Sequence, residues 1–430
     1  MKRIIILATT ILLIAGINSC TTSEKAKDTK ELVFSFWGSP EQVKIDEEII
    51  EKFKEQHPGV EIKTIHIPSQ SRYNDKLLTM IAGGTPPDVM FVHLNAFPTY
   101  ADSGKLLALD ELVKRDLKKE IKDIYPLALK SFTYRGKLYA FPRDVSGWVM
   151  YYNKDLFDKA KIKYPDKSWT WKDFEEACKK LTKDTNGDGV KDVYGAIFPQ
   201  YLPMILYAFG GKIFDNEEDP EKCVIGEYKE NLEALRYAKR LFKEGAVAPM
   251  EIGSGVGTHE IFMSGKIGMY FTGKWKVPDF KKITKFKWDV APVPKGKARR
   301  ATRQSGSALA IAKNSKNREL AWEFVKYYTG KEGVKISTKS GRMTPIYKSL
   351  INSRLFLEQR PPEHVKYFAD TMEYGITGTK FPKNGEVLYT LFNVFTMVIE
   401  GQLSEEEGIK RLQEELSRIV ENYRAERGDK

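Results

Sequence analysis

The chain has 430 residues, of which 41% are hydrophobic and 12% are aromatic. This composition excludes a disordered chain, and the length exceeds one ordinary hydrophobic core, so two domains are expected. The formal net charge is +12. Because the basic residues are scattered along the sequence, we interpret this charge as a solvated surface and expect no nucleic-acid partner.

The N-terminus has the pattern of an export signal. Two basic residues precede an apolar stretch, residues 4–14, that is too short to span a membrane. The sequence INSC that follows resembles the bacterial lipobox, in which the cysteine, here Cys20, carries a lipid. We therefore predict a lipoprotein signal peptide over 1–20, a tether over 21–30 and a lipid-anchored body outside the cytoplasmic membrane. An ordinary signal peptide that happens to contain Cys20 is the alternative.

The first part of the body alternates predicted strands and helices. The strands are expected over 31–37, 60–67 and 89–92, and the helices over 41–57 and 72–82. The third strand is wholly apolar, which is typical of a strand buried on both faces of a parallel sheet. The order predicts βαβ units and a doubly wound α/β lobe.

Ligands of such sheets bind beyond the carboxyl ends of the strands. That rule selects Trp37, Gln70 and Asn95, which follow the three predicted strands. An aromatic face and side-chain amides are what a sugar requires, because its C–H faces stack on rings and its hydroxyls need donors and acceptors. Core packing is the alternative for Trp37, and a helix N-cap is the alternative for Asn95.

A polar break at residues 144–147 separates two apolar runs. We interpret it as a crossing from one lobe to the other, with Asp144 and Trp148 placed where a ligand could be held. Thr170 and Asp173 are spaced as a capping box for the next helix.

The segment 184–192 begins D-x-N-x-D-G, like a calcium loop, with Asp184, Asn186 and Asp188 as ligands. The twelfth position is Gly195, where an EF-hand requires a bidentate Glu. A solvated Asx/Gly turn is therefore preferred over a calcium site.

Candidate ligand residues recur in the second half of the chain. Trp275 follows a predicted strand, 267–271, and a Gly-containing turn, with packing under the loop as the alternative. Ser307 precedes the strand 308–312 and marks a second crossing, and Arg342 lies in a turn that marks a third. The remainder is predicted helical, ending in a helix capped by Ser404.

Several segments resemble one family, the extracellular solute-binding proteins of ATP-binding-cassette sugar importers, which includes maltose-binding protein. The matching segments run in order along the mature chain and include FWGSPEQ, IAGGTPPDVMFV, GKLYAFP, WVMYYNKDLFDKAKI, IFMSGKIGM, WDVAPVPKG and SGRMTPIYKSL. The resemblance implies a periplasmic-binding-protein-like II fold, with two lobes joined by a multi-crossing hinge and a ligand cleft between them. We expect the first lobe over 31–143 plus 293–347 and the second over 144–292 plus 348–430.

The resemblance also bears on single positions. Asn95 falls where maltose-binding protein has a sugar-binding acid, and Trp275 matches a stacking tryptophan. The segments of Trp37, Trp148, Ser307 and Arg342 are ones that reach the ligand in this family, and Glu386 is a further candidate.

The leading hypothesis is therefore a monomeric, non-enzymatic, cofactor-free protein that closes on a saccharide and delivers it to a membrane permease. An anionic ligand such as a sugar phosphate or glycerol phosphate is the alternative, received by Arg299, Arg300 and Arg303. A surface glycosidase using Asp144 and Glu386 is a remote alternative.

Overall fold

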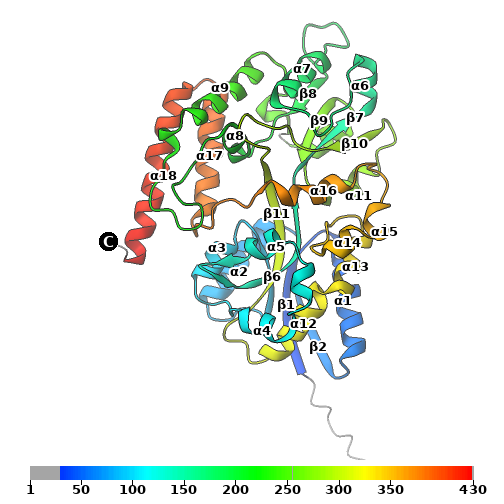
Figure 1. Ribbon diagram of the computed structural model, residues 1–430, viewed down its shortest axis with the longest axis vertical. Helices are drawn as coiled ribbons and strands as arrows, with labels where there is room; N and C mark the ends of the chain where they lie inside the picture. Colours follow the sequence, from blue (N-terminus) through cyan, green and yellow to red (C-terminus); the bar gives the residue numbers. More distant parts are fainter. Residues whose placement is uncertain (1–29, 254, 429–430) are drawn as a thin grey trace, which may run out of the picture.

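The computed structural model describes residues 30–253 and 255–428 and consists of two α/β lobes, one above the other in Figure 1. The predicted signal peptide, Cys20 and residues 21–29 of the tether lie outside the described residues. Among the helices that the structure describes, none is long and apolar enough to cross a membrane.

The first lobe is built on the sheet β12-β11-β3-β1-β2, with β6 paired to β11. Strands β1, β2 and β3 are parallel, whereas β11 runs antiparallel to both β3 and β6. Strand β11 is reversed because it carries the chain back from the other lobe. The main elements are β1 Lys30–Trp37, α1 Pro40–Gln56, β2 Val60–Ile67, α2 Gln70–Ala82, β3 Val89–His93, α3 Phe97–Asp102, α4 Asp110–Asp116, α5 Pro126–Ser131, β6 Ala140–Gly147, β11 Thr302–Ile311, α12 Arg318–Thr329 and α13 Lys331–Lys339.

The second lobe is built on the sheet β10-β7-β9-β8, in which only the β8–β9 pair is parallel. Strand β7 leads the chain away from the hinge, so the strands that bring the chain back toward it run in the opposite direction. Its elements are β7 Val149–Asn153, α6 Lys154–Ala160, α7 Trp171–Leu181, β8 Tyr194–Ile197, α8 Leu202–Phe209, α9 Lys229–Lys243, α10 Thr258–Met263, β9 Ile267–Thr272, α11 Val277–Phe280, β10 Trp288–Ala291, α14 Lys348–Ile351, α15 Arg354–Leu357, α16 Lys366–Asp370, α17 Asn384–Ile399 and α18 Glu405–Arg427, while the short β12 Gly375–Ile376 pairs with β11.

Local sequence signals fix several helix starts. Thr170 accepts a hydrogen bond from the Asp173 backbone and the Asp173 carboxylate accepts one from the Thr170 backbone, which confirms the predicted capping box of α7. Ser404 and Glu407 cap α18 in the same way. These caps satisfy N–H groups that have no partner inside the helix, so each helix begins at a defined residue.

The chain passes between the lobes three times. Val145 packs in the first-lobe core and Val149 in a second-lobe core, so the first crossing lies between them. Val293 and Ala301 pack in a second-lobe core, so the return crossing begins with β11 at Thr302, later than the expected position 293. The third passage lies within α14, since Leu350 packs in the first-lobe core and Ile351 in a second-lobe core, close to the expected boundary at 347–348.

The lobes also touch away from these crossings. In Figure 1 the C-terminal end of α18 reaches the level of α3 in the first lobe. The Tyr423 hydroxyl donates to Asp102 Oδ2 at 3.0 Å, and the Thr99 hydroxyl donates to the Pro382 carbonyl at 2.6 Å. These polar contacts close one side of the space between the lobes.

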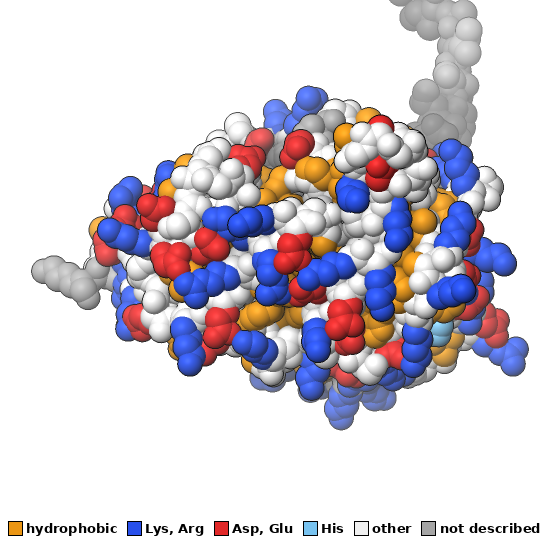
Figure 2. Space-filling view, turned by 90° about the horizontal axis from the view of Figure 1, so that it is seen from above, with side chains coloured by type: hydrophobic (Ala, Val, Ile, Leu, Met, Phe, Trp, Pro, Cys, Tyr) orange, Lys and Arg blue, Asp and Glu red, His pale blue; other side chains and the backbone are white. Residues whose placement is uncertain are grey.

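The second-lobe end of the molecule carries Lys, Arg, Asp and Glu side chains mixed over one face (Figure 2). Over most of this face, side chains of opposite charge lie beside one another, and Lys and Arg predominate along its lower edge. The mixture agrees with the interpretation of the net positive charge as a solvated surface rather than a nucleic-acid-binding stripe.

Candidate functional site

A cavity of about 720 Å³ lies between the lobes, beside the three crossings. Its size is typical of a small-molecule site. Eight of the nine candidate ligand residues line it: Trp37, Gln70, Asn95, Asp144, Trp148, Trp275, Ser307 and Arg342. Residues from both lobes and from the first two crossings therefore meet at one place, together with Arg342, which precedes the third crossing.

Glu386, the ninth candidate, does not line the cavity, although its neighbour Gly385 does. Its side chain is 61% exposed and lies 3.9 Å from Lys383. Helix α17 begins at Asn384, earlier than the expected start near Leu388, and this places Glu386 inside its first turn.

The first-lobe wall is formed by the ends of the parallel strands. Trp37, at the end of β1, packs against Tyr73 and Phe91 with ring centroids 5.2 and 5.4 Å away, yet remains part of the cavity lining. Trp37 therefore packs against the core and also lines the cavity. Asn95 lies between β3 and α3, and α3 has Ala96 at its N-cap without a side-chain cap bond, so Asn95 does not cap that helix.

The second-lobe wall carries two more indoles, Trp148 between β6 and β7 and Trp275 in the turn after β9. Gly273 makes room for the Trp275 ring, because a Cβ on Gly273 would lie 1.9 Å from Trp275 Cζ3. Between them, the fully buried Lys274 donates to the Gly341 carbonyl at 2.6 Å and to Gln359 Oε1 at 2.7 Å. The turn that carries Trp275 is thereby tied to the segments before and after the third crossing.

Where the crossing strands β6 and β11 pair, a hydrogen-bond network surrounds Arg143, a residue that was not predicted from the sequence. Arg143 Nε donates to Asp144 Oδ1 at 3.1 Å and to Ser307 Oγ at 3.0 Å, and Ser307 also donates to Asp144. Behind it, Arg143 Nη1 lies 3.8 Å from Asp46 Oδ1. Burial raises the pKa of Asp46 to about 6, although the charge of Arg143 opposes this shift. Asp144 Oδ2 accepts no hydrogen bond from the residues that the structure describes.

His93, at the end of β3, was also missed. Its Nδ1 accepts a hydrogen bond from the Asn95 backbone N–H at 3.2 Å, so the neutral ring carries its proton on Nε2, which faces Ser305 Oγ at 3.2 Å. Burial, followed by the charge of Arg303, lowers the pKa of His93 to about 3. The cavity therefore holds a neutral imidazole with a fixed tautomer.

The structure separates Arg299, Arg300 and Arg303, the three arginines that the sequence offers for an anionic ligand. Arg303 lines the cavity, whereas Arg299 lies over the Tyr207 ring and Arg300 donates to the backbone carbonyls of Val293 and Lys167, outside the cavity lining. Of these three arginines, only Arg303 lines the cavity.

Asp144 is the one carboxylate among the described residues that line the cavity. A glycosidase requires two carboxyl groups facing each other across the scissile bond. Because Glu386 is outside the lining, this cavity does not offer the pair that the glycosidase hypothesis needs.

The segment resembling a calcium loop forms turns stabilised by its own backbone. The Asp184 carboxylate accepts from the N–H groups of Gly187 at 2.7 Å and Gly189 at 2.8 Å, and Asn186 and Asp188 each accept from the N–H two residues on, as in Asx turns. Gly195, at the twelfth position, packs on α7, and a Cβ there would lie 2.3 Å from Cys178 Cα. No side chain that could supply the missing ligand fits at this position without a shift of the backbone.

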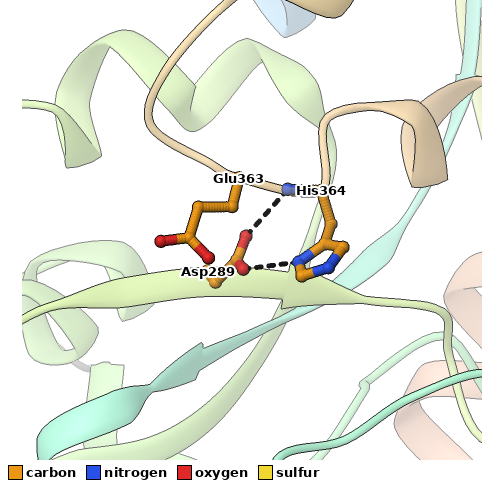
Figure 3. A group of neighbouring side chains, drawn as sticks. All are labelled: Asp289, Glu363 and His364. Carbon is orange, nitrogen blue, oxygen red and sulfur yellow. Dashed lines mark hydrogen bonds and ion pairs between the residues drawn. The ribbon is translucent and has the colours of Figure 1, made fainter.

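A group of ionisable side chains on the second lobe consists of Asp289, Glu363 and His364 (Figure 3). His364 Nδ1 lies 2.6 Å from Asp289 Oδ2, and Lys154 Nζ lies 3.5 Å from Glu363 Oε1. Asp289 also accepts from the backbone of Val290 at 2.9 Å. These partners already satisfy the group, and we assign no metal to it.

Several known proteins are similar to this chain. An arabinooligosaccharide-binding protein of Bacillus subtilis is 27% identical over 335 residues, covering 75% of this chain and 74% of that protein. An uncharacterized lipoprotein of Streptomyces antibioticus is 25% identical over 333 residues, covering 75% of this chain and 71% of that protein. Among solved structures, an ABC substrate-binding protein of Listeria monocytogenes in complex with cycloalternan superimposes with a TM-score of 0.81 at 28% identity, covering 94% of this chain and all of that one.

Residues 37–335, more than half of the chain, match the family described as bacterial extracellular solute-binding protein. The match confirms the resemblance found in the sequence and, with the structural similarity, the predicted fold class. It also confirms the expectation of a protein that binds its ligand rather than transforming it. The chain belongs to the bacterial extracellular solute-binding protein family.

Proposed function

We propose that this chain is the substrate-binding component of an ATP-binding-cassette importer and that it captures a mono- or oligosaccharide between its lobes. The observation that carries the proposal is the placement of three indoles, Trp37, Trp148 and Trp275, around one cavity of about 720 Å³. Rings that line a cavity from both lobes can stack on successive apolar faces of a sugar.

Polar side chains complete the complementarity. The amides of Gln70, Asn74 and Asn95 line the cavity and offer donors and acceptors for hydroxyl groups. Arabinooligosaccharide and cycloalternan, named for two of the similar proteins, are both saccharides, which favours this ligand class here as well.

The mechanism is closure about the three crossings. A ligand that contacts Trp37 on one lobe and Trp275 on the other has more contacts when the lobes are closed, so binding favours the closed state. We further propose that the closed protein docks on a membrane permease, that it acts as a monomer, and that a lipid on Cys20 holds it at the outer face of the cell membrane.

A thermal-shift screen tests the ligand class. The mature protein is heated with a panel of neutral and acidic mono- and oligosaccharides, and the positive compounds are measured by isothermal titration calorimetry. A saccharide that binds the native state raises Tm by mass action. If no saccharide shifts Tm, the proposal is wrong, and if the compounds are cleaved during incubation, the protein is an enzyme.

A further inference from the structure

Arg303 presents a guanidinium group that no acid in the described chain neutralises. Its Cζ lies over two rings, 5.1 Å from the Trp148 centroid and 5.0 Å from the Tyr201 centroid. Its Nε is enclosed without a hydrogen-bond partner, and none of its nitrogens forms a hydrogen bond or ion pair with the residues that the structure describes. The rings fix the position of the group without using its N–H donors.

An unpaired cation in such a place is costly. Burial lowers the pKa of Arg303, because the charged form loses its hydration. A buried cation is usually paired with an acidic side chain, as Arg143, which lines the same cavity, is paired with Asp144 and Asp46. For Arg303 the structure supplies aromatic faces but no carboxylate.

The other charged groups of the cavity do not neutralise Arg303. The described lining residues include three arginines, Arg143, Arg303 and Arg342, and the single carboxylate of Asp144, whose Oδ1 is held by Arg143 and Ser307. His93, which is neutral, cannot balance a positive charge. The cavity is therefore a positively charged site with unused guanidinium donors.

We infer that the natural saccharide carries a carboxylate, as a uronic acid residue does, and that this group pairs with Arg303. The inference rests on the proposed function and narrows its ligand class. A planar carboxylate matches the fork of N–H donors of a guanidinium. The aromatic contacts at Arg303 come from Trp148 and Tyr201, so the acidic sugar would lie on the second-lobe side of the cavity.

The test compares ligands that differ only in charge. Oligogalacturonides and glucuronate-substituted xylo-oligosaccharides are each titrated beside their methyl esters, which keep the size and hydroxyl groups but lose the charge. We expect the acid to bind roughly 10- to 100-fold more tightly than its ester, because hydrogen bonds to charged partners are the stronger ones. The advantage should shrink as salt is added, since the pair borders a solvated cavity.

Two substitutions connect the preference to the residue. Arg303→Gln should abolish the difference between acid and ester, and Arg303→Lys should keep part of it. Arg299→Gln, a neighbouring arginine outside the cavity lining, is the matched control and should keep the full difference. A Tm of each free variant that is no lower than that of the wild type shows that the fold is intact.

The outcomes separate this inference from the proposed function. If neutral saccharides or the esters bind wild-type protein as tightly as the acids, the carboxylate inference is wrong while carbohydrate binding stands. If only glucose 1-phosphate or inorganic phosphate binds, both are wrong. If the acids are preferred and Arg303→Gln retains the preference, another group recognises the charge and Arg303 is not its partner.

Discussion

Trp275 offers the sharpest test of the binding site, because its indole contributes to the cavity and not to the cores. It belongs to none of the three hydrophobic clusters of the described chain, whereas Trp37 and Trp148 each pack against one. Trp275→Ala should therefore leave the free energy of unfolding nearly unchanged and act on ligand affinity.

The magnitude follows from the surface that a stacked sugar covers. One face of the indole amounts to roughly 80 Å², about a third of what a tryptophan can bury. At about 25 cal/mol per Å² this surface is worth about 2 kcal/mol, or about 30-fold in Kd. Isothermal titration calorimetry with a saccharide found in the screen measures the loss, and urea unfolding checks the stability.

Gly273→Ala supplies an independent version of the same test. The added Cβ would lie 1.9 Å from Trp275 Cζ3, so the ring must leave its position although it is still present. A loss of affinity approaching that of Trp275→Ala is expected, and Trp275→Phe, which keeps an aromatic face, should lose less. Wild-type affinity in both Trp275→Ala and Gly273→Ala would remove the indole from the binding site.

Three further outcomes are expected. The pKa of His93 is lowered to about 3 in the folded protein, so the unfolded chain takes up a proton first as pH falls. The stability that His93 contributes should therefore be complete above about pH 6.5 and decline toward pH 3. Urea unfolding of wild type and His93→Gln across this range should show this pH-dependent loss in the wild type only. Asp144→Asn should lower the free energy of unfolding by about 2 kcal/mol in urea titrations, because Arg143 loses a charged partner while Asp46 remains. Calcium at millimolar concentration should leave Tm unchanged, since the twelfth position is Gly195, where a Cβ would lie 2.3 Å from Cys178 Cα and no carboxylate ligand fits.

The residues of the first lobe that line the cavity could be predicted from the sequence because their position follows a general rule. Parallel strands end at one edge of a sheet, so Trp37 and Asn95 could be placed together without knowing any contact. Arg143 could not be found in this way. Its partner Asp46 is 97 positions earlier in the chain and Tyr328 is 185 later, and only the folded structure brings them together.

Arg303 shows a different limit. The sequence predicted a strand beginning at residue 308, but β11 begins at Thr302, because the loop before it packs on the second lobe. Side chains alternate along a strand, so Arg303, Ser305 and Ser307 share one face and line the cavity together. A strand start misplaced by six residues hides this alternation, so the sequence does not separate Arg303 from Arg299 and Arg300, which lie outside the cavity lining.

The positions of the charged and aromatic residues around the cavity indicate which of them select the ligand and which stabilise the closed state. The aromatic residues Trp37 and Trp275 lie on opposite lobes, so their separation depends on the hinge, whereas Arg303 and Asp144 lie on the crossing strands β11 and β6, which pair with each other. The charged groups therefore keep their mutual arrangement as the lobes move. We expect the crossing strands to determine which ligand binds and the indoles to supply the contacts that are gained on closure.

On this reasoning Arg303→Gln should weaken binding of an acidic saccharide without preventing closure on its neutral ester, while Trp275→Ala should weaken binding of both ligands alike. Small-angle X-ray scattering of the saturated variants, which reports the compaction of the molecule, distinguishes the two effects, and an Arg303→Gln protein that stays open with saturating ester would contradict the division.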